Sequence, residues 1–251
     1  MNDPTRAHDR RTFLRGAVAI VCAPPLFTAC RDDDTVAAPR DAATDADPWP
    51  VPEGTTLSAA RYVALAALMD ALIPGDDRAA GAFAAHAHWY VDQLLGAFRS
   101  DPPRIYAGGP YSGRHGGHDG FSEFQRLTRV EALRWRTYIE GSRGLPEREW
   151  NGPVVGLIER YAQGLDSLDV AAVEAGASRF ADLGLNARRG LLTRVDADFV
   201  QLAYEHAVEG TYGDPVYGGN RDGVGWAAIA YEGDRQPVGY TARQMSNPEE
   251  G

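Results

Sequence analysis

The sequence predicts a mostly α-helical protein, with one helical domain, long glycine-rich loops and an ordered aromatic segment near the C-terminus. In the body of the chain, apolar residues recur every three or four positions, which is the spacing of one face of an α-helix. No sustained alternation of apolar and polar residues, the pattern of a half-buried strand, is visible. Helix-starting and helix-ending residues flank several of the periodic stretches. These observations favour a single helical domain over residues 55–240.

The first two helices are predicted from apolar spacing. One follows Ser58 and ends at Pro74-Gly75, and its apolar face holds Tyr62, Leu65, Ala66, Leu68, Met69, Leu72 and Ile73. The second ends before Pro102-Pro103 and carries Phe83, Ala87, Tyr90, Val91, Leu94 and Phe98 at spacings of three and four. Residues 101–120 then form a long loop, and long loops in compact domains are usually functional or disordered. Its apolar residues favour a packed or docking loop: Ile105, Tyr106 and Tyr111.

The remaining helices follow from capping signals and periodicity. Thr128 begins the third helix, because Glu131 stands three residues later as in a capping box, and the helix runs to Gly141. A fourth helix is expected over residues 154–161, with shorter pieces near 170–180 and 187–193. The last covers 197–209, and its inward residues are Phe199, Val200, Leu202, Ala203 and His206. Gly210 is the predicted C-terminal cap of this helix, in the positive-φ conformation that glycine tolerates.

Residues 1–30 have the features of an export signal, which is set aside before the fold is considered. Arg10-Arg11, with Phe13 and Leu14 behind them, matches the twin-arginine pattern. The apolar run that follows, over residues 16–29, is shorter than the roughly 20 residues that span a bilayer. A signal peptide is therefore a better interpretation than a membrane anchor. We expect export by the twin-arginine route to the periplasm or the outer face of the cytoplasmic membrane.

Cysteine usage agrees with this placement. Cys22 and Cys30 lie within or just after the signal, and the rest of the sequence has no cysteine for a disulfide or a thiolate metal site. Small residues precede Cys30 as in a lipoprotein cleavage site, although Phe27 stands where leucine is usual, so lipidation of Cys30 stays open. Membrane association is expected only through such a lipid or through a partner. The acidic, Ala- and Pro-rich residues 31–54 predict a linker, and residues 241–251 a flexible tail.

Charge and motif content exclude several classes of function. The formal charge is −10, and all 25 basic residues are arginine. Nucleic-acid binding depends on neutralising phosphates with basic residues, so no nucleic-acid partner is expected. The sequence has no dinucleotide fingerprint, no phosphate-binding loop and no Cys-x-x-Cys-His haem motif. The chain is therefore expected to bind no cofactor and to be non-catalytic alone.

The most informative stretch runs from His206 to Trp226. Asp214-Pro215 opens a turn, and Gly218-Gly219-Asn220 supplies residues that tolerate left-handed geometry. Its aromatic side chains are equally compatible with core packing and with anchoring an interface: Tyr212, Tyr217 and Trp226.

The histidines of the body are candidate metal ligands. His206 and Glu209 lie three apart, so one helical face can present both, but no second Glu-x-x-His or His-x-x-Glu occurs. A structural His206 that donates to a backbone carbonyl at the helix end is favoured, and a partner-facing role stays open. His86 and His88, two apart, are expected on different faces of a helix. Glycine-rich flanks give no preorganisation to the loop pair, His115 and His118. No metal site is predicted.

The stretch from His206 to Trp226 resembles the C-terminal signature of the gluconate 2-dehydrogenase subunit 3 family. The signature has a His, then Glu-Gly, Asp-Pro-x-Tyr-Gly-Gly-Asn and Gly-Trp, and the matching residues are His206, Glu209, Gly210, Asp214, Pro215, Tyr217, Gly218, Gly219, Asn220, Gly225 and Trp226. Residues 230–233 depart at two positions from the Gly-Tyr-Pro-Gly that often follows. A weaker similarity covers residues 70–76 and 81–82.

The resemblance implies an accessory small subunit of an exported, FAD-dependent dehydrogenase complex. Such a subunit binds the catalytic flavoprotein and supports its folding and export, so the FAD is expected in the large subunit. A cytochrome c subunit commonly completes such complexes. Two alternatives stay open: a self-sufficient metalloprotein that uses His206, Glu209 and Asp214, and an exported binding module with no dehydrogenase partner.

Overall fold

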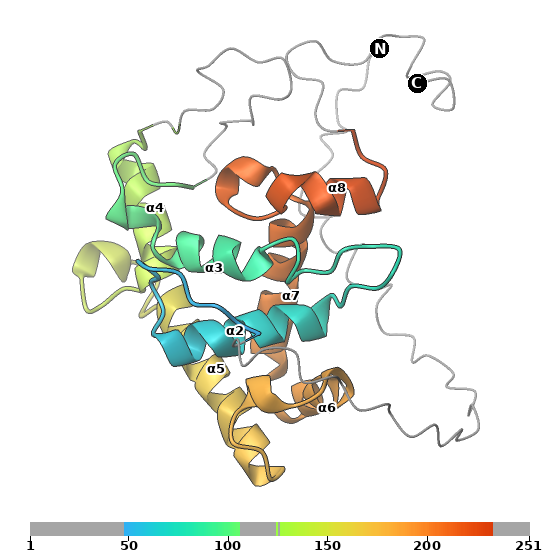
Figure 1. Ribbon diagram of the computed structural model, residues 1–251. Helices are drawn as coiled ribbons and strands as arrows, with labels where there is room; N and C mark the ends of the chain where they lie inside the picture. The colour runs from blue at the N-terminus through green and yellow to red at the C-terminus, as the bar shows by residue number, and fades with distance from the viewer. Residues whose placement is uncertain (1–47, 106–123, 125, 233–251) are drawn as a thin grey trace, which may run out of the picture. The chain divides into compact units, whose positions relative to one another are not determined.

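The computed structural model describes residues 48–105, 124 and 126–232, which form an all-helical body (Figure 1). The seven α-helices in this part of the chain are α2 (Ala59–Leu72), α3 (Ala87–Leu95), α4 (Arg129–Glu140), α5 (Leu157–Glu174), α6 (Leu185–Leu191), α7 (Ala197–Tyr212) and α8 (Val224–Ala228). Single 3-10 turns lie at η2 (Ala97–Arg99), η5 (Pro146–Arg148), η6 (Phe180–Asp182), η7 (Leu192–Arg194), η8 (Pro215–Tyr217) and η9 (Arg221–Gly223). No strand occurs among the described residues, so the mostly α prediction is confirmed there.

Several predicted features lie outside the described residues. These are the export signal with Arg10, Arg11, Phe13, Leu14 and Cys30, the loop residues Tyr106, Tyr111, His115 and His118, and the tail 241–251. Of the long loop, Ile105 is described and is buried. None of the described helices has the length and apolar character needed to cross a membrane.

Helix α2 is the centre of the core. Nine of its fourteen residues are buried, including the unbroken run from Tyr62 to Met69. A helix that is apolar on every side is surrounded by other elements, so the single apolar face predicted for it is too narrow a description. It contacts α3, α5, α6 and α7, and Figure 1 shows α2 and α3 side by side with α5 and α7 running across them.

Two predicted helices have different bounds in the structure. Helix α3 begins only at Ala87, because His86 takes the left-handed conformation with φ 60°, and Phe83 lies in the turn before it. The pieces predicted near 154–161 and 170–180 are largely one helix, α5. Gly164 in its middle does not end it. A Cβ on Gly164 would collide with the ring of Phe199, so this glycine leaves room for that side chain of α7.

The N-terminus of α4 matches its prediction. The Thr128 hydroxyl accepts from the Glu131 amide at 3.3 Å, and the Glu131 carboxylate accepts from the Thr128 amide at 2.8 Å. This reciprocal capping box satisfies two amide donors that the first helical turn leaves unpaired. At the other end Gly141, with φ 81°, closes the helix where a side chain would meet the Val154 carbonyl at 2.8 Å.

The end of α7 corrects the prediction for Gly210. The helix continues to Tyr212, and Gly213 caps it with extended backbone at φ −71° and ψ 176°. Gly210 lies inside the helix without a positive φ, and a Cβ there would lie 2.8 Å from the Cα of Ala87. Its missing side chain brings α7 close to α3. Of the residues predicted to face inward, Val200 is only partly buried and the others are buried: Phe199, Leu202, Ala203 and His206.

The described packing begins at Trp49, within the stretch predicted as a linker. Its buried indole packs edge-on against Phe83 with ring centroids 4.7 Å apart, and the guanidinium of Arg188 lies 5.2 Å over it. Arg188 donates to the Ala67 carbonyl and to the Asp70 carboxylate, both at 2.8 Å. These contacts fix α6 to α2.

The weaker family-like patch, residues 70–82, forms a closed turn after α2. The Asp76 carboxylate accepts from the amides of Arg78 and Ala79 at 2.8 Å, which caps the turn. The Ala82 amide donates to the Ile73 carbonyl at 2.8 Å, and Gly81 lies so close to that carbonyl that no Cβ fits. The turn thereby returns the chain toward α3.

Candidate functional site

The predicted motif folds back on the end of α7 through the side chain of Asn220. Asn220 is fully buried and left-handed, with φ 44°. Its backbone amide donates to the Gly210 carbonyl at 2.6 Å, and its Nδ2 donates to the Gly213 carbonyl at 2.8 Å. Its Oδ1 accepts from the Gly225 amide at 2.9 Å. One buried amide side chain therefore joins the end of α7 to the start of α8.

The motif glycines allow two backbones to touch. A Cβ on Gly219 would collide with the Gly210 carbonyl, and a Cβ on Gly225 would collide with the Thr211 carbonyl. Gly218 takes the left-handed conformation with φ 98°. A Cβ on Gly218 would lie 3.2 Å from the Trp89 indole. Any side chain at these places would push α8 off the end of α7.

The aromatic side chains of the motif are divided between core and surface. Trp226 is buried, its Nε1 donates to the Tyr212 carbonyl at 2.6 Å, and its ring meets Tyr231 edge-on at 5.2 Å. Tyr217 is half-buried and packs edge-on against Phe124 at 5.6 Å. Tyr212 is also half-buried. Trp226 thus serves the packing of the chain itself, and an interface role for the two tyrosines stays a prediction.

The turn between α7 and η8 is built as its sequence predicts. Asp214 accepts from the Val216 amide at 2.9 Å, and Pro215 occupies the first position of the turn. Both residues are partly exposed. Proline needs no amide partner at this position, and the aspartate satisfies one of the amides that remain.

His206 and Glu209 each have a tyrosine partner. His206 is buried, with its Nδ1 2.8 Å from the Tyr161 hydroxyl and its ring stacked on the same tyrosine. The expected backbone-carbonyl partner for His206 is therefore wrong. Glu209 is exposed and accepts from the Tyr90 hydroxyl at 2.8 Å. Within the described ranges, no three side chains of His, Cys, Asp or Glu gather as metal ligands would.

Burial sets the protonation of this region. It lowers the pKa of His206, against the nearby Glu209 and Glu205 carboxylates, which raise that pKa. Burial also raises the pKa of Tyr161 well above its ordinary value. The histidine is therefore neutral and the tyrosine protonated near neutral pH, and one hydrogen bond joins the two neutral groups.

The two neighbouring histidines also depart from expectation. His86 precedes α3, and its ring lies 5.4 Å from that of His88, so the two do not diverge as helical neighbours would. The His86 Nε2 lies 3.0 Å from the Arg221 guanidinium, which connects the motif to the start of α3. His88 is buried against Phe83, and burial followed by the charge of His86 lowers the pKa of His88 to about 3.

Sequence reasoning missed the residues that support the site. Tyr161 and Tyr90 lie 45 and 119 positions from their partners, so no local pattern pairs them. The buried Asp92, which accepts from the Thr56 and Leu57 amides at the entry to α2, was missed for the same reason. The one available signal was the place of Tyr90 among the apolar residues of a predicted helix.

The family model described as gluconate 2-dehydrogenase subunit 3 matches residues 59–233, which is more than half of the chain. The chain belongs to this family. The match begins at the first residue of α2, contains every described helix, and extends past the motif. It confirms the resemblance, and it points to a subunit of a gluconate 2-dehydrogenase-type complex with partner subunits. Neither a search of curated proteins nor a search of solved structures returned a match.

In this subunit 3 protein the motif residues fall into two groups. The first group is buried and holds the fold: His206, Gly210, Gly219, Asn220, Gly225 and Trp226. The second is exposed or half-buried: Glu209, Tyr212, Asp214, Pro215, Tyr217 and Gly218. Only the second group is open to a partner, whereas the first group joins α7 to α8 within the chain.

Proposed function

We propose that this subunit 3 protein is the accessory small subunit of an exported FAD-dependent dehydrogenase complex. It binds the catalytic flavoprotein and supports the folding and twin-arginine export of that partner. The observation that carries the proposal is the family match over residues 59–233, because the family is defined as one subunit of an oxidoreductase. The twin-arginine pattern at Arg10-Arg11 supports the export half.

Physical logic supports the pairing of export with escort. The twin-arginine route moves folded proteins, and a flavoprotein takes up its FAD in the cytoplasm. A companion that leaves by this route folds before export, in a reducing compartment. The body of this chain has no cysteine, so its fold needs no disulfide. A helical core centred on α2 supplies the stability instead.

The proposal assigns chemistry to the partner and assembly to this chain. The large subunit holds the FAD and oxidises the substrate, and a cytochrome c subunit accepts the electrons in complexes that contain one. This chain is non-catalytic alone, and the assembled complex lies in the periplasm or at the outer face of the cytoplasmic membrane. Membrane association comes from a lipid on Cys30 or from a partner subunit.

Replacement of the signal arginines tests the escort role. With the large subunit co-expressed, Arg10→Lys with Arg11→Lys should leave both chains in the cytoplasmic fraction, measured by immunoblot and by flavin absorbance in each fraction. Arg6→Lys, outside the paired arginines, is the matched control and should leave export intact. Export of the flavoprotein despite the paired substitution would overturn the escort role.

The metalloprotein alternative receives no support from the described residues. His206 points to Tyr161 in the core and Glu209 to Tyr90 at the surface, so the two do not converge on one point. Metal analysis of the purified chain gives a direct comparison, with less than one metal ion per chain expected.

A further inference from the structure

Helix α4 is far more exposed than the helices around it. Of its twelve residues only Ile139 is buried, whereas nine of the fourteen residues of α2 are buried. It packs against α5, α3 and η5 and leaves apolar side chains open to solvent. Val130 is 66% exposed and Tyr138 is 41% exposed.

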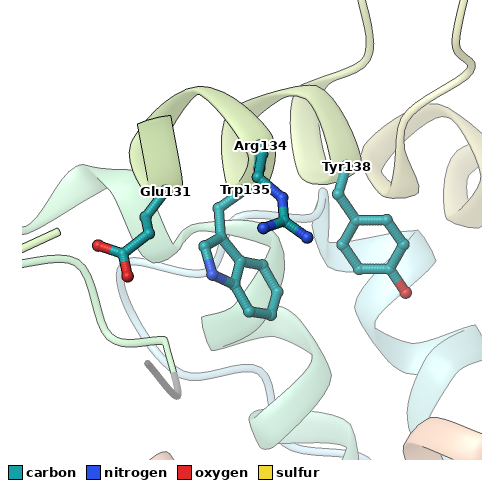
Figure 2. Close-up of a pocket in the computed structure, with 4 residues that line it drawn as sticks. All are labelled: Glu131, Arg134, Trp135 and Tyr138. Carbon is teal, nitrogen blue, oxygen red and sulfur yellow. The ribbon is translucent and has the colours of Figure 1, made fainter. Parts of the chain in front are cut away.

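The exposed side chains of α4 line two hollows. One, of about 520 Å³, is lined by Glu131, Arg134, Trp135 and Tyr138, which leave α4 on the same side in Figure 2. The other, of about 420 Å³, lies between α4 and residues 147–154 and shares Arg134 and Tyr138 with the first. The rings of Trp135 and Tyr138 are 6.0 Å apart and edge-on. We call the surface that lines the two hollows the α4 face, and we define it by Arg134, Trp135, Tyr138, Trp150 and Val154.

Trp150 is the most exposed large apolar side chain of the described residues, at 91%. The turn that carries it is held in place, because Arg148 donates to the Glu140 carboxylate at 2.9 Å and to the Gly141 carbonyl at 3.1 Å. The Arg148 side chain is only 9% exposed. The backbone that carries this indole therefore needs little reordering when a partner covers it, and tryptophan, tyrosine and arginine dominate binding hot spots.

The charge of this region is opposite to that of the chain. Residues 126–148 contain six arginines and three glutamates, a formal charge of +3 in a chain whose formal charge is −10. Four of these arginines are exposed: Arg126, Arg129, Arg134 and Arg143. An apolar surface beside exposed guanidinium groups complements an apolar surface bordered by carboxylates. A folded protein can offer both features in one patch.

We infer that the α4 face is the docking surface for the catalytic flavoprotein, and that the matching patch on the flavoprotein is apolar with an acidic border. The inference rests on the proposed function, since it takes the flavoprotein as the partner. It also separates two roles along the chain. The C-terminal motif fastens α8 to α7, and the α4 face binds the partner.

Capture of the co-expressed flavoprotein by the affinity-tagged chain tests the docking surface. Two variants alter the α4 face: Trp150→Ala with Tyr138→Ala, and Arg134→Glu. Each should lower the flavin absorbance recovered per tagged chain by about tenfold or more. The matched controls are Tyr204→Ala on α7 and Arg189→Glu on α6, both exposed, which should capture as the wild type does. Circular dichroism and thermal melting of all four variants establish that they fold alike.

The outcomes separate the docking surface from the proposed function. If the wild-type chain captures no flavoprotein, the proposed function fails, and the inference fails with it. If the wild type and both α4 variants capture equally, or if the control variants lose the partner instead, the docking surface is wrong while the function stands. Binding of the wild-type chain to phosphatidylglycerol vesicles, lost in the α4 variants while flavoprotein capture is kept, would assign the face to lipid and overturn the inference. The inference is supported if Arg134→Glu captures less flavoprotein than the wild-type chain and if capture by the wild-type chain falls with added salt.

Discussion

At the scale of single residues, the hydrogen bonds of Asn220 hold the two ends of the motif together. Its side chain is fully buried and serves the Gly213 carbonyl and the Gly225 amide together. The backbone of Asn220 is left-handed, a conformation that asparagine tolerates better than most residues. Both properties explain why an amide residue stands at this position.

Replacement of Asn220 should therefore cost stability. Asn220→Ala leaves the partly buried Gly213 carbonyl and the buried Gly225 amide without their partner, and a buried group without a partner costs about 1–3 kcal/mol. We expect the free energy of unfolding, from urea denaturation, to fall by about 2–4 kcal/mol. Asn186→Ala on the exposed side of α6 is the control and should change it by less than about 0.5 kcal/mol. Equal values for the two variants would contradict the role of Asn220.

The buried His88 makes the stability of the protein depend on pH. The pKa of His88 in the fold is about 3, below the ordinary 6.5. Between these two pH values the unfolded chain binds a proton at His88 that the folded chain does not bind. The stabilisation is fully present above pH 6.5 and is lost as the pH falls toward 3, at about 1.4 kcal/mol per pH unit. The lowered pKa of His206 acts in the same direction.

His88→Phe should flatten that pH dependence. Phenylalanine keeps the stacking on Phe83 and removes the Nδ1 atom of His88, which has no hydrogen-bond partner within the described part of the chain. We expect the free energy of unfolding to be kept or raised at pH 7, and to fall less steeply between pH 6.5 and 4 than in the wild type. Urea denaturation at a series of pH values measures both, and an unchanged slope would show that other groups dominate the acid response.

At the scale of elements, close contacts between helices depend on glycine. Gly210 of α7 faces α3, where a Cβ would lie 2.8 Å from the Cα of Ala87. Gly190 of α6 has open space at the same position. Both lie in helices, so alanine brings a similar gain in helix propensity at either place.

The pair of glycine variants isolates the packing between α3 and α7. Gly190→Ala should raise the free energy of unfolding by about 0.5–1 kcal/mol, because only the propensity changes. Gly210→Ala should lower it by about 1–3 kcal/mol, because the added methyl group forces the two helices apart. Thermal or urea denaturation of the two variants gives the comparison directly, and a stabilised Gly210→Ala would contradict the contact.

The same glycines show how far the sequence alone can predict this fold. The capping box of Thr128 and Glu131 and the stop at Pro74-Gly75 depend on a few neighbouring residues, so local rules find them. Gly210 looks like a helix end in the sequence, yet it lies inside α7, as Gly164 lies inside α5, and a distant element packs on each of them. Whether a glycine ends a helix or receives a neighbouring helix is decided by tertiary contacts.

The candidate site divides in the same way. The Asp214-Pro215 turn and the left-handed Gly218 and Asn220 follow from residue type and were predicted. The side-chain partners of His206 and Glu209 come from α5 and α3. They are far away in the sequence and were not predicted. The α4 face was also missed, because periodicity places apolar residues on a helix without saying which of them remain uncovered.

At the scale of the whole molecule, the remaining question is how the complex is held at the membrane. A lipid on Cys30 would supply one anchor, because the acyl chains of a lipoprotein cysteine are buried in the bilayer. Cys30→Ser should move the chain, expressed without its partners, from the membrane fraction to the soluble periplasmic fraction. An inhibitor of the lipoprotein signal peptidase should leave the wild-type precursor uncleaved. Normal processing in its presence would exclude lipidation.

The scarcity of buried residues in α4 also affects how readily this helix unfolds locally. A helix with only one fully buried residue opens more readily than α2, so its amide hydrogens should exchange with deuterated solvent much sooner. A partner that covers the α4 face would slow this exchange and leave the already slow α2 unchanged. The helix would then report assembly of the complex by its own mass shift, without a label or a substrate.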